Sequence, residues 1–350
     1  MTRVVWLLAA VLAAGGAIGA SAEGRATQPA QVCALLPSTT VARWERLDRR
    51  YLAAAFAAAG VSHRIVNAVG SGRRQRAQAR TCLAGGADVL LVVPVDEAVG
   101  RAVGRLAAAA GATVVEYERL TPGGTASYYV SSDSVLAGRL MAEGVVSALA
   151  ARTGGPRRPV VARLDGPASE PESALVAGGA GAVLARAARS RRLVEGPTLS
   201  VAGRSSGEAL LVARRLLGGS KPRVDAVIAT DDALAGAVVA ALEERGRVPI
   251  PLAGRGATVQ GLRNVVSGRQ TGTVYASPKL QANAAARVVT ALVAGRPVRT
   301  NGWTSDGARR VPSVLLRPVW ITRVNYAALL AEGVYTRSEI CGGVYARYCR

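Results

Sequence analysis

The sequence predicts an α/β protein built from two similar lobes, each with a parallel sheet. Three observations support this fold class. Short apolar runs alternate with Ala-rich segments of helical spacing, the alternation occurs twice, and the stretch at 151–159 with Gly and Pro separates the two series. Strands that alternate with helices form parallel sheets with crossover helices on both faces. The 350 residues suffice for two domains of ordinary size.

The first series begins at residue 31, and its helical segments include 42–60 and 97–111. Its strand-like runs are 31–37, 63–69, 87–94, 112–118 and 127–133. The strand-like runs of the second series are 159–166, 192–201, 224–232, 250–257 and 271–278. A helix, a strand-like run at 313–322 and a Cys-bearing tail follow. Each run is short enough for a buried strand.

The first 22 residues have the layout of a secretory signal peptide. Arg3 precedes an apolar stretch, and the small residues of 20–22 fit the pattern of a cleavage site. The alternative is an uncleaved membrane anchor, for which the apolar stretch is short. No Cys follows in a position for lipid attachment. We therefore expect an exported, soluble chain in the periplasm or cell envelope, without a lipid anchor.

Export changes how the four cysteines are interpreted, because an oxidising compartment favours disulfides. Cys341 and Cys349 would close a short C-terminal loop, and Cys33 and Cys82 would then pair by elimination. Metal binding is the alternative. His63 is the only histidine and no Cys-x-x-Cys pair occurs, so we predict neither a metal nor another cofactor.

The formal net charge of +21 raises the question of a nucleic-acid partner. The cations are almost all Arg, they are scattered along the chain, and the densest cluster, at 72–80, contains no aromatic residue. Nucleic-acid sites combine basic grooves with aromatic residues. The charge therefore indicates a solvated Arg-rich surface, and we predict no nucleic-acid partner.

Charged side chains follow several of the predicted strands. Glu118 and Arg119 follow one strand of the first series, and Asp231 and Asp232 end one of the second. Ligands of parallel α/β sheets bind beyond the carboxyl ends of the strands. A carboxylate that accepts and a guanidinium that donates together suit the vicinal hydroxyls of a polyol. The alternative for Asp232 is a cap on the following helix.

Two motifs raise the possibility of an enzyme. The segment 203–207 fits Gly-x-Ser-x-Gly, but that catalytic arrangement needs a later His, and His63 comes earlier. The segment 178–183 has the glycines of a dinucleotide-binding loop, yet it falls within a helical stretch. We therefore predict that the protein is not an enzyme.

Six segments in this order resemble the periplasmic sugar-binding proteins of ABC importers, most closely the xylose-binding branch of the type I periplasmic-binding-protein family. The resemblance extends from about residue 31 to 335. It rests on ARWERLDRRYLAAAFAAAG, ADVLLVVPVDEAV, GATVVEYERL, YYVSSDSVLAGRLMAEGVV, VDAVIATDDALAGAVVAALEERG and VVSGRQTGTVY. It implies two Rossmann-like lobes, joined by a three-strand hinge, that close over a sugar without catalysis.

The resemblance also divides the chain. The signal peptide is 1–22, the first lobe is 31–133 with about 279–312, and the second lobe is 134–278. The remaining segment, 313–350, is a C-terminal strand and a disulfide-closed tail.

The ligand-binding residues that the resemblance implies are carried over position by position. The family's Arg-Trp matches Arg43 and Trp44, its Asp-Arg corresponds to Glu118 and Arg119, and its Asn-Asp corresponds to Asp231 and Asp232. Other second-lobe segments depart from the family. Their sequences here are Gly-Arg-Gly at 254–256, Tyr-Ala-Ser-Pro at 275–278, and the segments 168–174 and 195–207.

The expected function is capture of a xylose-like pentose or another sugar between the lobes, followed by delivery to an ABC permease by a monomeric protein. The alternative is a degenerate relative that serves as a structural or sensory envelope protein without sugar capture. The retained first-lobe residues favour sugar capture, and the altered second-lobe segments favour the alternative.

Overall fold

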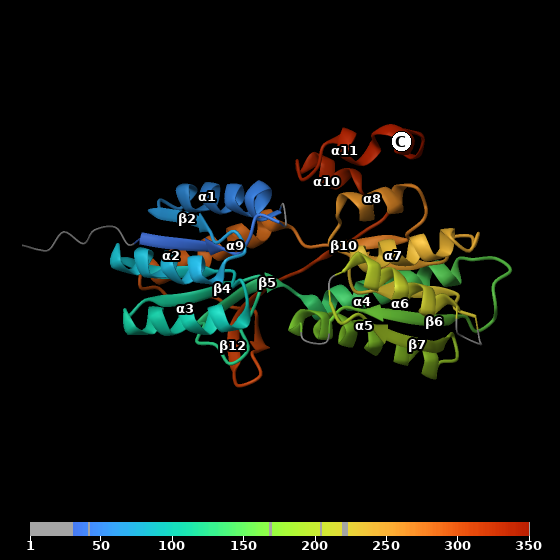
Figure 1. Ribbon diagram of the computed structural model, residues 1–350, viewed down its shortest axis with the longest axis horizontal. Helices are drawn as coiled ribbons and strands as arrows, with labels where there is room; N and C mark the ends of the chain where they lie inside the picture. The colour runs from blue at the N-terminus through green and yellow to red at the C-terminus, as the bar shows by residue number, and fades with distance from the viewer. Residues whose placement is uncertain (1–30, 41–42, 168–169, 204, 219–222, 350) are drawn as a thin grey trace, which may run out of the picture.

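The computed structural model describes residues 31–349 except 41–42, 168–169, 204 and 219–222. These residues form two lobes, each built on one sheet, that lie side by side along the long axis of the molecule (Figure 1). The two-lobe α/β fold predicted from the sequence is confirmed. The predicted signal peptide at 1–22 lies outside the described residues.

The first lobe is built on a seven-stranded sheet in the order β11-β12-β5-β4-β3-β1-β2. Its strands are parallel except for β11, which runs antiparallel to β12. The strands are β1 (Gln31–Leu36), β2 (His63–Asn67), β3 (Ala87–Val92), β4 (Thr113–Tyr117), β5 (Tyr128–Ser132), β11 (Gly302–Ser305) and β12 (Arg310–Leu316). The helices are the π-helix η1 (Trp44–Asp48), α1 (Arg49–Ala58), α2 (Gly72–Ala84), α3 (Glu97–Ala109) and α9 (Pro278–Val293).

The second lobe is built on a six-stranded sheet in the order β13-β10-β9-β8-β6-β7. All its strands are parallel except β13, which runs antiparallel to β10. The strands are β6 (Val160–Asp165), β7 (Val194–Ser200), β8 (Ala226–Ala229), β9 (Leu252–Arg255), β10 (Gly272–Tyr275) and β13 (Val319–Ile321). The helices are α4 (Ser134–Ala150), α5 (Pro171–Arg189), α6 (Ser206–Gly218), α7 (Asp232–Glu243) and α8 (Val259–Val266).

Both sheets are covered by helices on both faces, which explains why the central strands are apolar on both sides. In the first lobe, one apolar cluster joins the sheet to Phe56 of α1 and Val289 of α9, and another joins it to Val103 of α3. In the second lobe, Val238 of α7 packs on one face and Met141 of α4 on the other.

The chain passes between the two sheets three times, after β5, after β10 and after β12. The last of these passages departs from the sequence prediction. The strand-like run at 313–322 is divided between β12, in the first sheet, and β13, in the second. Pro318 lies between the two strands. Because proline has no N–H to donate to a strand ladder, it ends one pairing and lets the chain begin another.

The structure contains the two disulfides expected from the sequence. Cys33 of β1 is bonded to Cys82 of α2 inside the first lobe. Cys341 is bonded to Cys349 in a C-terminal tail of short helices, α10 (Ala327–Ala331), α11 (Arg337–Cys341) and the 3-10 helix η2 (Gly343–Tyr348). In Figure 1 the tail lies beside α8 of the second lobe.

Candidate functional site

An ion pair between Arg43 and Glu118 lies at the carboxyl end of the first-lobe sheet. Arg43 immediately precedes η1, and Glu118 follows the last residue of β4. Arg43 Nη2 lies 2.7 Å from Glu118 Oε1. Arg43 also donates to Asp48 at 2.8 and 3.0 Å and to Gln281 at 3.0 Å. The guanidinium therefore joins η1, β4 and α9 at one point.

The backbone of Glu118 adopts a conformation that few non-glycine residues adopt, with φ at 65°. Three contacts hold it there. Its N–H donates to the Val130 carbonyl at 2.9 Å, its own carbonyl accepts from the Tyr129 hydroxyl at 3.0 Å, and its carboxylate accepts from Ser131 at 3.3 Å. Such local strain persists only where surrounding contacts compensate for it, and it is common at functional sites.

The charges around Arg43 reinforce one another. Burial alone would lower the pKa of Arg43, but Glu118 and Asp48 raise it well above its usual value. Asp48 is fully buried and also accepts from the Tyr117 hydroxyl at 2.8 Å. Arg43 is therefore a permanent cation held between two carboxylates.

Trp44 lies underneath this pair with only 4% of its surface exposed. The guanidinium of Arg43 lies 4.7 Å from the ring centroid, and that of Arg119 lies 5.8 Å from it. Arg119 also donates to the Pro94 carbonyl at 3.1 Å. A cation over an indole ring is stabilised by the ring quadrupole. The structure thus brings Arg43, Trp44, Glu118 and Arg119 together, with the indole beneath the two arginines.

The two adjacent acids of the second lobe have different environments. Asp231 is the half-buried N-cap of α7, where its carboxylate accepts from the Leu234 N–H at 2.8 Å. Asp232 is only 2% exposed and accepts from Thr258 N, Thr258 Oγ1 and Gln270 Nε2 at 2.8, 3.1 and 3.1 Å. The sequence-based alternative placed the helix cap at Asp232, whereas the structure places it at Asp231.

Asp232 connects three segments inside the second lobe. Its contacts join α7 to Thr258, the N-cap of α8, and to Gln270, just before β10. Burial raises the pKa of Asp232, although the hydrogen bonds from Thr258 and Gln270 act in the opposite direction. Its position is that of an interior acid that holds the carboxyl-end loops of the lobe in place.

A second ion pair, between Glu172 and Arg255, was not among the residues predicted from the sequence. Arg255 Nη1 lies 2.7 Å from Glu172 Oε1, which also accepts from Ser134 at 3.2 Å. Arg255 is the last residue of β9 and the middle residue of the altered Gly-Arg-Gly segment, and its Nε donates to the Thr230 carbonyl at 3.3 Å. The pair therefore lies at the carboxyl end of the second sheet.

The two ion pairs act on each other across the gap between the lobes. Burial alone would raise the pKa of Glu172, but Arg255 lowers it, and the charge of Arg43 lowers it further. Burial alone would lower the pKa of Arg255, but Glu172 raises it, with further contributions from Glu118 and Asp231. Each cation thus interacts with carboxylates of both lobes.

A cavity of about 680 Å³ lies within the second lobe, and a cavity of about 550 Å³ lies between the lobes. Glu118 and Arg119 line the interlobe cavity from the first lobe, and Glu172 lines it from the second. Asp231 lines the cavity within the second lobe. Ligand pockets commonly lie between domains and have volumes of about 300–1,000 Å³. Of these two cavities, the interlobe cavity is therefore the one in which a ligand can meet a carboxylate of each ion pair.

One buried acid, Glu116, lies beside this cavity and is only 2% exposed. Burial raises the pKa of Glu116 to about 7, with a further rise from Asp306, although Thr121 and Arg309 lower it. Its two oxygens accept from the N–H and the hydroxyl of Thr121, a residue that lines the interlobe cavity. Glu116 is thus protonated in the folded state at pH values where an unfolded glutamate is ionised.

We expect the free energy of unfolding to fall as the pH rises between about 4.5 and 7. Below this window Glu116 is protonated in both states, and within it only the folded state keeps the proton. The expected loss is about 3 kcal/mol. Urea unfolding at several pH values measures it, with Glu97→Gln as an exposed control. An unchanged pH slope in Glu116→Gln would contradict the assignment to this carboxyl.

In the part of the chain that the structure describes, no helix is both long enough and apolar enough to span a membrane. The same residues contain no group of three His, Cys, Asp or Glu side chains that could hold a metal ion.

The two lobes, the three interlobe passages and the charged cavity between the lobes define the class of two-lobed binding proteins. Residues 33–297 match the family described as periplasmic binding protein domain. The chain belongs to this family, and the resemblance found in the sequence is confirmed.

Two relatives cover most of the chain. The D-xylose-binding periplasmic protein of Escherichia coli (strain K12) is 26% identical over 300 residues, which are 85% of this chain and 88% of that protein. The multiple sugar-binding periplasmic receptor ChvE of Rhizobium radiobacter is 27% identical over an alignment of 349 residues that covers 94% of this chain and 98% of that protein.

Solved structures show the same fold. An ABC transporter solute-binding protein from Clostridium phytofermentans with bound β-D-glucose has a TM-score of 0.73 and 22% identity, covering 89% of this chain and 99% of that chain. A carbohydrate transporter solute-binding protein from Chloroflexus aurantiacus in complex with D-glucose also has a TM-score of 0.73, with 23% identity, covering 88% of this chain and 98% of that chain.

Proposed function

We propose that this protein is an exported solute-binding protein that captures a monosaccharide between its lobes and delivers it to an ABC importer. One observation supports this most strongly. The first-lobe pair Arg43–Glu118 and the second-lobe pair Glu172–Arg255 each place a carboxylate, Glu118 or Glu172, in the wall of the cavity between the lobes. A solute between them would contact both lobes, so its binding would favour the closed form.

The chemistry of the two pairs suits a neutral polyol. The carboxylates of Glu118 and Glu172 accept hydrogen bonds from hydroxyls, and the guanidinium groups donate to them. Each cation already has a carboxylate partner at 2.7 Å, so the site does not require an anionic solute to balance its charge. This chemistry favours a neutral sugar over an acidic one.

The predicted residues receive different roles in this proposal. Arg43, Glu118 and Arg119 contact the solute from the first lobe, and Trp44 supports the two guanidinium groups from below. Glu172 and Arg255 contact it from the second lobe, with Asp231 contributing charge near Arg255. Asp232 acts indirectly by holding the loop that begins at Thr258.

The names of the relatives support a sugar as the solute and export as the route. One relative is named for D-xylose and another for multiple sugars, and both are named as periplasmic. Residues 1–22 would then serve as the signal peptide, and the monomeric protein would dock on a membrane permease. The relatives are binding proteins, which supports a function without catalysis.

A thermal-shift panel of pentoses, hexoses, polyols and sugar acids tests the proposal on the chain from residue 23, made under oxidising conditions. We expect a neutral sugar to raise the melting temperature, because a ligand that binds only the folded state stabilises it. The same sugar should have no effect on an Arg119→Ala variant at the same concentration. A folded protein that responds to no member of the panel would contradict sugar capture and favour the degenerate envelope protein.

A further inference from the structure

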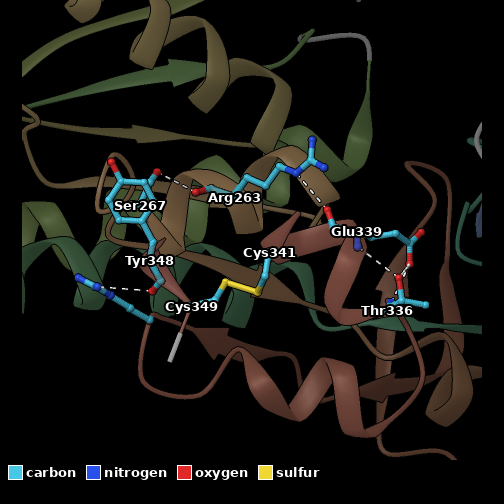
Figure 2. The surroundings of a disulfide bond; sticks show 8 residues. Arg263, Ser267, Thr336, Glu339, Cys341, Tyr348 and Cys349 are labelled. Carbon is cyan, nitrogen blue, oxygen red and sulfur yellow. Dashed lines mark hydrogen bonds between the residues drawn. A yellow bond between two sulfur atoms is a disulfide. The ribbon is translucent and has the colours of Figure 1, made fainter. Parts of the chain in front are cut away.

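The C-terminal tail is ordered by contacts of its own. Helix α11 has five residues and begins with a capping box between Thr336 and Glu339, in which Thr336 N donates to Glu339 at 2.7 Å and Glu339 N to Thr336 at 3.2 Å. Cys341, two residues after Glu339, is bonded to Cys349, and this disulfide closes the C-terminal loop, as Figure 2 shows. Isolated helices of this length are unstable in water. The disulfide and the capping box therefore keep Glu339 in a defined position.

The second lobe holds this tail firmly. Arg263 of α8 donates to the Glu339 carbonyl at 3.0 Å, a contact drawn in Figure 2, and its guanidinium lies 5.1 Å from the ring centroid of Tyr345. The Tyr275 hydroxyl donates to Glu332 at 2.9 Å. An apolar cluster also joins α8 to the tail, and its members include Leu262, Val266, Leu329, Ile340 and Cys341.

The same tail reaches the first lobe through η1. Arg46 Nη1 lies 2.7 Å from Glu339 Oε1, Arg46 Nη2 donates to the Val334 carbonyl at 3.0 Å, and the guanidinium lies 5.6 Å from the ring centroid of Tyr335. Leu47, which is 6% exposed, belongs to the apolar cluster of the tail. One turn of helix thus binds the tail with its Arg46 and Leu47 side chains.

That turn also carries part of the candidate site, since Arg43 directly precedes η1 and Trp44 begins it. We propose that the tail is a positioning clasp, fixed to the second lobe and joined to η1 by Arg46, that sets Arg43 and Trp44 relative to the second-lobe pair. The proposal rests on the proposed function for its effect on solute affinity. A site that is already positioned binds more tightly, because less ordering accompanies binding.

Calorimetric titration with the sugar found in the panel tests the clasp. We expect Arg46→Ala to raise the Kd by about 5-fold or more, and Arg46→Lys to recover part of the loss. Adding Glu339→Gln to Arg46→Ala should raise the Kd little further, because both substitutions remove the same Arg46–Glu339 ion pair. The matched control is Arg269→Ala, which removes an exposed ion pair of 3.0 Å with Glu243 inside the second lobe. Equal affinities of wild type and Arg46→Ala would overturn the clasp.

A second measurement does not depend on the solute. Ketone-bearing amino acids are introduced at the exposed positions 105 and 215, so that spin labels can be attached without using cysteine. The distance between the two labels reports the separation of α3 in the first lobe and α6 in the second. We expect a broader distance distribution in Arg46→Ala and in Cys341→Ser/Cys349→Ser than in wild type and Arg269→Ala. Identical distributions would contradict the clasp, even if wild type bound sugar. If the wild type bound no sugar but had a narrower distance distribution than Arg46→Ala, only the proposed function would be contradicted.

Discussion

Replacing Arg43 by Ala is expected to abolish solute binding and to lower the free energy of unfolding by about 3–5 kcal/mol. Arg43 is the shared partner of Glu118 and Asp48, which are 8% and 0% exposed. Without it two buried carboxylates face each other with no cation between them. Chemical denaturation measures the stability, and calorimetric titration measures the solute affinity.

Arg64→Ala is the matched control for this variant. Arg64 is an exposed arginine of β2 in the same lobe, and surface substitutions usually change stability by less than about 0.5 kcal/mol. If Arg43→Ala were as stable as Arg64→Ala and bound the solute as tightly, the Arg43–Glu118 pair would contribute neither to stability nor to solute binding.

Replacing Asp232 by Ala is expected to lower the free energy of unfolding by about 2–4 kcal/mol. The substitution leaves the Thr258 N–H and the Gln270 amide without their buried acceptor. Because the carboxylate points to these groups, we expect any loss of solute affinity to follow from the loosened Thr258 loop. Urea unfolding and calorimetric titration of the same preparation separate the two effects.

The neighbouring acid supplies the comparison. Asp231→Ala removes one helix cap, for which about 1 kcal/mol is expected. Stability should therefore fall more in Asp232→Ala than in Asp231→Ala. Loss of solute binding in Asp232→Ala with stability unchanged would instead make Asp232 a direct solute contact.

The fold was predictable because its signals are local. The alternation of apolar runs and helical segments predicts the strands of both sheets except β11, and the predicted run at 313–322 is divided at Pro318 between β12 and β13. Arg43 and Trp44 were predicted only from the family resemblance, whereas Glu118 and Arg119 also follow a predicted strand. The structure brings the four side chains together at the carboxyl end of the first sheet.

The second-lobe half was not predictable, since its contacts join segments far apart in the chain. Glu172 and Arg255 are separated by 83 residues, and neither is distinguished by local spacing. Asp231 and Asp232 look alike in sequence, because the strand–helix junction alone does not reveal which carboxylate caps the helix and which turns inward. The contact of Arg46 with Glu339 spans 293 residues and is equally invisible in the sequence.

A crystal structure of the protein with the most stabilising sugar tests the central claim most directly. We expect the sugar between the Arg43–Glu118 and Glu172–Arg255 pairs, with its hydroxyls within hydrogen-bonding distance of both carboxylates. A sugar bound only in the second-lobe cavity beside Asp231, without contact to the first lobe, would contradict the account.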